Sequence, residues 1–178
     1  WKDKTEEYVY NSGNDMCEIL ALQEFSTLED LKKFPYLREL CLNECIVDDN
    51  TALGELTKLE NLKLDGYSID SLDRLKNLTA LKSLIIQGAE FEDLQALKEL
   101  TNMEELRLPN NNIKNIDALE KMTNLEELIL YGNQIKNISA LRKLCKLRVL
   151  KLEGNLIEDV EPLMNLKNLE KLSLGDNP

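Results

Sequence analysis

Residues 125–144, LEELILYGNQIKNISALRKL, contain the spacing that decides the fold. Leu128 and Leu130 lie two residues apart, which is the period of a short, half-buried β-strand. After Asn133, isoleucine and leucine recur at every third residue. A period of three suits a 3₁₀ or extended segment better than an α-helix, which has 3.6 residues per turn. The stretch therefore predicts a strand, a turn and a tight return segment.

The same spacing recurs every 22 residues. Six complete frames cover residues 37–168, and a partial seventh frame follows at 169–178. Frame positions 1, 4, 6, 11, 14, 17 and 20 are apolar in 41 of 42 cases, and Asn50 is the exception. One frame cannot bury its leucines alone, so the frames are expected to stack into a solenoid with a parallel sheet.

Frame position 9, just after each strand, carries a repeated asparagine. An asparagine amide can bond to backbone groups of the turn and of the neighbouring coil. We therefore predict a structural ladder of buried asparagines: Asn111, Asn133, Asn155 and Asn177. Earlier frames have Cys45, Tyr67 and Ala89 at this position, and irregular turns are expected at Tyr67 and Ala89.

The overall composition is that of an acidic globular protein. The 178 residues include 37 leucines and are 43% hydrophobic, which excludes a disordered chain. The longest uninterrupted apolar runs, 19–22 and 128–131, have four residues, whereas a membrane span needs about twenty. With 33 acidic and 22 basic residues the net charge is −11, so nucleic acid is not an expected partner.

The chain also lacks the usual equipment of an enzyme. It contains no histidine, which excludes Ser-His-Asp and Cys-His arrangements and histidine-containing zinc sites. No glycine-rich phosphate loop and no Cys-x-x-Cys pair are present. Close carboxylates carry little information among so many acids, so we expect no catalytic residues, cofactor or metal.

The pattern LxxLxLxxNxIxxIxxLxxL at 125–144 resembles the leucine-rich repeat family, and the resemblance covers 37–178. The 22-residue form is similar to two branches, the bacterial internalin-like group and a regulatory subunit of a protein phosphatase. Residues 157–163, IEDVEPL, match the internalin-like motif I-x-D-[IV]-x-P-L, whereas 113–118 and 135–140 fit either branch. The resemblance implies an α/β solenoid, a right-handed arc with a parallel concave sheet and short 3₁₀ or extended convex segments.

The two ends depart from the repeat. Residues 15–36 are expected to form a degenerate first repeat, in which Leu28, Leu31 and Phe34 occupy core positions. Residues 1–14 form an N-terminal flank or cap, and the repeats proper cover 37–178. Because the chain stops partway through a frame, we expect it to be part of a longer protein.

The cysteines bear on localisation. Cys45 and Cys145 are expected to be core-facing or sheltered, and Cys17 and Cys41 are about 8 Å apart on adjacent strands, too far for a relaxed disulfide. Unpaired thiols favour a reducing compartment such as the cytoplasm. Membership of the internalin-like group would instead imply a secreted or surface-attached protein, so localisation remains open.

A strip on the concave face is the candidate binding site. Outward strand positions there combine apolar, aromatic and basic side chains, the types that often supply binding energy. The residues expected to bind a partner are Ile85, Arg107, Ile129, Tyr131, Lys63 and Lys151. The alternative is that the basic residues simply pair with neighbouring glutamates on a solvated sheet, where each pair contributes little.

Three functions compete on these grounds. A monomeric protein-binding module comes first, because an extended curved surface suits recognition. The second is a structural or targeting segment of a larger protein whose activity lies outside this chain. An enzyme comes last, for want of histidine.

Overall fold

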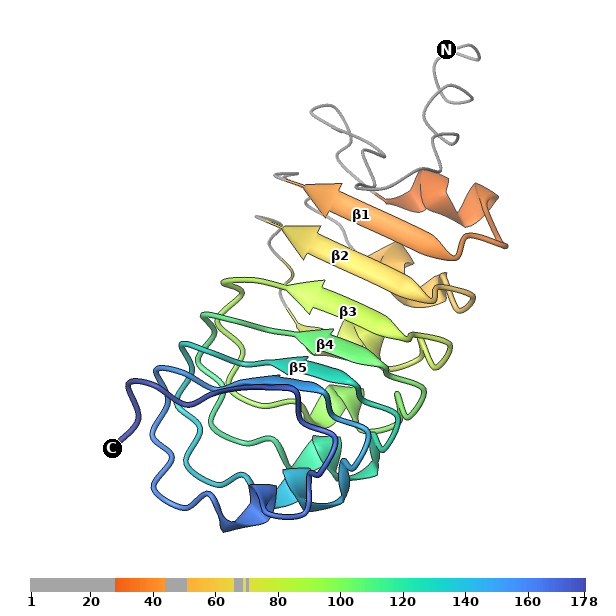
Figure 1. The fold of residues 1–178 in the computed structure, drawn as a ribbon. Coiled ribbons are helices and arrows are strands. Elements are labelled where there is room, and N and C mark those ends of the chain that lie inside the picture. Colours follow the sequence, from red (N-terminus) through yellow and green to blue (C-terminus); the bar gives the residue numbers. More distant parts are fainter. Residues whose placement is uncertain (1–27, 44–50, 66–68, 70) are drawn as a thin grey trace.

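A single parallel sheet runs through the part of the chain that the structure describes. The structure is a computed structural model, and it describes residues 28–43, 51–65, 69 and 71–178. The expected flank at 1–14, most of the degenerate first repeat, Cys17, Cys45 and Tyr67 lie outside these residues. Within them, seven strands follow one another across the sheet in chain order (Figure 1).

Each coil pairs one strand with one short helix. The strands are β1 (Glu39–Asn43), β2 (Asn61–Asp65), β3 (Ser83–Ile86), β4 (Glu105–Arg107), β5 (Glu127–Ile129), β6 (Val149–Lys151) and β7 (Lys171–Ser173). The helices are η1 (Glu29–Lys33), η2 (Thr51–Glu55), η3 (Leu72–Leu75), η4 (Gln95–Leu97), η5 (Asp117–Lys121), η6 (Ser139–Lys143) and η7 (Glu161–Leu163). All seven are 3₁₀-helices, as the period of three predicted.

The strand register confirms the 22-residue repeat. Leu84 pairs with Leu106, and Leu106 pairs with Leu128, so each residue lies beside its counterpart one frame later. The leucines of frame positions 4 and 6 point inward and form one continuous core with the apolar residues of the return segments. The leucine-rich repeat solenoid is therefore the fold of this chain. None of the described helices has the length and apolar character needed to span a membrane.

The asparagines of position 9 tie adjacent coils together. The amide of Asn133 donates to Leu130 O of its own coil at 2.9 Å and to Leu108 O of the preceding coil at 3.1 Å. Its Oδ1 accepts the backbone N–H of Ile113 at 3.0 Å. Asn155 and Asn177 repeat this arrangement one and two coils later. Each amide thus satisfies backbone groups that would otherwise be buried without partners.

A left-handed residue precedes each of these asparagines. Gly132 has φ +68°, and an added Cβ would collide with Oδ1 of Asn110. Glycine is therefore suited to this position both by its backbone conformation and by the available space.

The coil with Ala89 has a different turn. Here the backbone N–H of Ala89 itself donates to Oδ1 of Asn111 at 2.9 Å, whereas position 11 supplies the donor in the following coils. Glu90 next to it has φ +62°, a conformation uncommon for a side chain of this kind. The irregular turn expected at Ala89 is present, because no asparagine orders this coil.

A second asparagine column, which the sequence analysis missed, lies at frame position 22. The amides of Asn102, Asn124 and Asn168 each donate to a backbone carbonyl of the preceding coil, at 2.7 to 3.3 Å. Asn102, for example, bonds to Thr79 O at 2.9 Å. The column starts at Asn102, because Ala80 is the corresponding residue one coil earlier.

Replacing Ala80 with asparagine is expected to extend this second column. The new amide would lie near Thr57 O as Asn102 lies near Thr79 O, raising the free energy of unfolding by about 0.5–1.5 kcal/mol. In thermal unfolding this corresponds to a melting temperature higher by about 1–6 °C. Ala80→Asp is the matched control, because a carboxylate has the same shape but no donor. An equal gain from Ala80→Asp would contradict the proposed hydrogen bond.

Phe34 and Cys145 are more exposed than expected. Phe34 keeps the backbone bond of its turn, from its N–H to Leu31 O, yet its side chain is exposed. Leu28 and Leu31 are buried as expected. Cys145 is exposed rather than sheltered, because it lies at position 21, where other coils carry the exposed Thr79 and Thr101.

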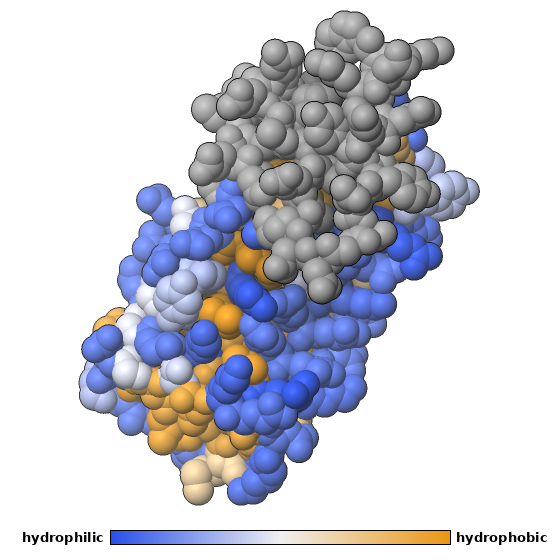
Figure 2. Space-filling view, turned by 45° about the horizontal axis from the view of Figure 1, so that its top comes forward, coloured by the Kyte–Doolittle hydropathy of each residue, from blue (hydrophilic) through white to orange (hydrophobic). Residues whose placement is uncertain are grey.

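Apolar side chains are exposed in the last two coils. Leu156, Val160, Met164 and Leu172 are exposed, and Leu169 and Leu174 are partly buried against the core. Figure 2 shows apolar surface in the half of the molecule farther from the residues drawn in grey. Val160 and Leu172 lie at frame positions 14 and 4, which are buried in the middle of the solenoid, so these two expected core positions are exposed in the last two coils. Leu156 and Met164 lie at positions 10 and 18, where the middle coils carry polar residues.

Candidate protein-binding surface

The expected binding strip forms one row across the sheet. The register places Lys63, Ile85, Arg107, Ile129 and Lys151 side by side on β2 to β6. Their neighbours in sequence, such as Leu84 and Leu128, point to the core, so the row faces away from it. We call the outward side of strands β1 to β7 the sheet face, and this row lies at its centre.

Ile129 differs from its neighbours in this row. Its residue exposure is 7%, although it lies outside the continuous apolar core. It sits between Arg107 and Lys151, whose long side chains flank it at one strand spacing of about 4.8 Å on each side. The free apolar area expected at Ile129 is therefore small, and Ile85, which is half-buried, offers more.

Arg107 lies between two glutamates of the same face. Its Nη2 is 2.5 Å from Oε1 of Glu105, and its Nε is 2.9 Å from Oε1 of Glu127. The second contact is an ion pair without hydrogen-bond geometry, and this buried Nε has no hydrogen-bond partner. With 40% of the side chain exposed, the guanidinium is held in place and still accessible.

The two lysines of the row differ in their partners. Nζ of Lys63 is 3.9 Å from a carboxylate oxygen of Asp65, a long contact between partly exposed groups. Lys151 makes no ion pair with any residue that the structure describes. The alternative, in which the basic residues of the strip pair with acidic neighbours, therefore describes Arg107 well and Lys63 weakly. It does not describe Lys151.

Tyr131 borders the row on the side where the strands end. It is half-buried, and its carbonyl accepts the backbone N–H of Asn110 at 2.9 Å. Glu153 occupies the same frame position one coil later, and its buried Oε2 has no hydrogen-bond partner. Ile129 is therefore the one buried residue of the expected site, and its other five residues are half-buried and accessible.

Frame position 2, at the other border of the sheet face, carries a ladder of charged side chains of both signs. Glu60 accepts from Arg38 and from Lys82, each at 2.8 Å, and Arg148 binds Glu170 at 2.9 Å. The hydrogen bond from Lys82 lowers the pKa of Glu60 from its ordinary value, and the charge of Arg38 adds to this effect. These carboxylates remain ionised at neutral pH and are already neutralised by their partners.

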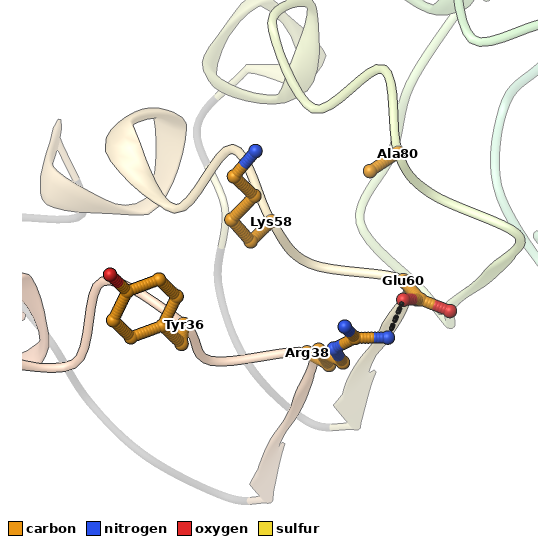
Figure 3. Close-up of a pocket in the computed structure, with 5 residues that line it drawn as sticks. All are labelled: Tyr36, Arg38, Lys58, Glu60 and Ala80. Carbon is orange, nitrogen blue, oxygen red and sulfur yellow. Dashed lines mark hydrogen bonds and ion pairs between the residues drawn. The ribbon is translucent and has the colours of Figure 1, made fainter.

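Two hollows lie next to this ladder, on the side of the sheet where the strands begin. The first, of about 230 Å³, is lined by Tyr36, Arg38, Lys58, Glu60 and Ala80 (Figure 3). The second, of about 410 Å³, is lined by Glu60, Ala80, Lys82, Asn102, Glu104 and Asn124. We call the two together the edge groove. The groove could not be predicted from the repeat pattern, because its lining residues lie outside the apolar frame positions. The one sign of a hollow in the sequence is the small side chain of Ala80 within the position-22 column.

Comparisons with known proteins agree with this geometry. The family model described as "Leucine Rich repeats (2 copies)" matches residues 101–143. A comparison with curated proteins gives no match. Among solved structures, internalin C2 of Listeria monocytogenes is 33% identical, with a TM-score of 0.82, over 85% of this chain and 67% of that one. The chain belongs to the internalin-like family of leucine-rich repeat proteins.

Two further structures extend the likeness. Internalin F of Listeria monocytogenes is 33% identical, with a TM-score of 0.76, over 83% of this chain and 44% of its own. A leucine-rich repeat protein of Leptospira interrogans is 25% identical, with a TM-score of 0.62, over 83% of this chain and 45% of its own. This internalin-like protein thus spans only part of the length of either relative.

The comparisons also decide between the two branches. Residues 157–163 match the internalin-like motif, and the internalins C2 and F are each 33% identical to this chain over the aligned residues. In the structure, Asp159 of that motif accepts the backbone N–H of Glu161 at 2.8 Å, at the start of η7. Leucine-rich repeat proteins are in general protein-interaction modules, and the chain shares that general role.

Proposed function

We propose that this internalin-like protein is a monomeric binding module that recognises a partner protein through its sheet face. The observation that carries the proposal is Arg107, whose guanidinium is fixed by Glu105 and Glu127 yet 40% exposed. A side chain that is already ordered loses less conformational entropy when a partner binds.

The surroundings of Arg107 supply the other elements of a recognition site. Ile85 is its strand neighbour, and Tyr131 lies two residues beyond Ile129, the neighbour on the other side. Arginine and tyrosine are enriched among the residues that dominate binding energy. Lys63 and Lys151 extend the strip at its two ends, and Ile129 contributes mainly to its packing.

The partner is proposed to be a protein rather than a nucleic acid, because the chain has a net charge of −11 and phosphate groups would be repelled by it. We also propose that binding requires no cofactor and that the chain is not an enzyme. No group of three acidic, cysteine or histidine side chains suited to a metal occurs among the described residues.

A purified partner tests the proposal through two substitutions. Proteins captured on the immobilised chain are identified by mass spectrometry, purified, and titrated against each variant. Arg107→Gln and Tyr131→Ala are each expected to weaken binding by about tenfold or more. Glutamine is preferred to glutamate at position 107, because a third carboxylate would repel Glu105 and Glu127.

Lys121→Glu, an exposed change on η5, is the matched control and should leave the affinity unchanged. All three variants should melt within about 2 °C of the parent, since none removes a core side chain. Binding that survives both sheet-face changes and is lost with Lys121→Glu would refute the proposal. Such a result would place the binding surface on the side of the 3₁₀-helices instead, whereas the alternative of a structural or targeting segment predicts that no partner is captured at all.

A further inference from the structure

The edge groove is separate from the strip around Arg107, with which it shares no lining residue. Its first part lies where the position-22 column has Tyr36, Lys58 and Ala80 in place of asparagine. Tyr36 is 84% exposed, and the methyl group of Ala80 leaves room between the coils. The groove therefore combines an accessible aromatic ring with a hollow beside it (Figure 3).

The groove carries a positive charge in a strongly acidic chain. Arg38, Lys58 and Lys82 line it together with two carboxylates, Glu60 and Glu104, so one positive charge is in excess. The chain as a whole has a net charge of −11. Glu60 is held between Arg38 and Lys82 at 2.8 Å from each, so its charge is already neutralised.

Lys58 is the cation that is left available. It is exposed and makes no ion pair with any described residue. In Figure 3 its ammonium group points away from the carboxylate of Glu60. The free positive charge thus lies at the Tyr36 end of the groove, whereas Glu104, which also lacks an ion pair within the described residues, lies toward the other end.

We propose that the edge groove binds an extended, acidic peptide segment of a partner protein. The groove crosses five coils, from Tyr36 to Asn124, which corresponds to about 19 Å at 4.8 Å per strand. An extended chain covers that length with about six residues. The acidic residues of the segment lie beside Lys58, and its other end, near Glu104, is uncharged.

Fluorescence anisotropy with a defined probe tests this proposal. The probe is a fluorescein-labelled peptide of four glutamates followed by four serines, and the matched peptide has four glutamines in place of the glutamates. At about 0.15 M salt, where charges more than about 8 Å away are largely screened, the acidic probe is expected to bind at least about fivefold more tightly than the matched peptide. Absence of binding, or equal binding of both peptides, would overturn the proposal.

Three variants distinguish binding of the probe in the groove from non-specific electrostatic attraction to the protein. Lys58→Glu removes the available cation, and Ala80→Leu fills the hollow without changing the charge; each should weaken the acidic probe by about fivefold or more. Lys136→Glu makes the same charge change at an exposed site outside the groove and should have little effect. A loss with Lys136→Glu as large as with Lys58→Glu would show non-specific attraction and overturn the proposal. Lys58→Glu alters an exposed side chain, so its result stands even if Ala80→Leu perturbs folding.

Discussion

Replacing Leu128 with alanine is expected to lower the free energy of unfolding by about 2–5 kcal/mol. Leu128 is 0% exposed, lies on the interior strand β5, and is paired on both sides, with Leu106 on β4 and Leu150 on β6. The adjacent coils repeat with the same register and cannot easily close over the space that the side chain leaves. Urea unfolding followed by circular dichroism measures the loss.

Leu172→Ala is the matched control for this change. Leu172 occupies the same frame position on β7, but it is 47% exposed, because no described strand lies beyond it. Its replacement should cost less than about 1 kcal/mol, since little apolar surface is returned to water. Similar losses at both positions would mean that the core is not built from the frame positions assigned here.

Replacing Asn133 with alanine is expected to lower the free energy of unfolding by about 1–3 kcal/mol, because the removed side chain is a buried hydrogen-bond partner. The change leaves the buried N–H of Ile113 without its acceptor and takes a donor from Leu108 O and Leu130 O. For a chain of this size the melting temperature should fall by about 2–12 °C.

Alanine substitutions at two other asparagines serve as controls for Asn133→Ala. Asn165→Ala removes an exposed side chain that makes no hydrogen bond with the described residues, and it should change the melting temperature very little. Asn177→Ala should have an intermediate effect, because Asn177 makes the same bonds as Asn133 but is only half-buried. Equal effects at Asn133 and Asn165 would contradict the structural role of the ladder.

The fold was predictable because its information is periodic. The spacing of Leu128, Leu130 and Asn133 recurs often enough that inward and outward positions, the strand register and the short return segments all follow from it. A pattern that is shared by all frames does not show where the structure of a single coil departs from it. The exposure of Phe34 depends on the particular coil rather than on its frame position.

The surface was less predictable than the core. The row from Lys63 to Lys151 follows from the register, but the low exposure of Ile129 depends on the side chains on either side of it. The pairing of Arg107 with Glu105 and Glu127 could be expected from charge alone, whereas its retained accessibility could not. The edge groove arises from size differences within one column and has no signal in the hydrophobic pattern.

The direction of the ladder bonds has a consequence for how the protein is made. Oδ1 of Asn133 completes the turn of the coil that comes before it in the chain, and Asn155 does the same for the coil of Asn133. During synthesis, which proceeds from the N-terminus, each turn therefore lacks its last partner until about one more coil has left the ribosome. The last turn to emerge therefore always lacks the acceptor that the next asparagine supplies.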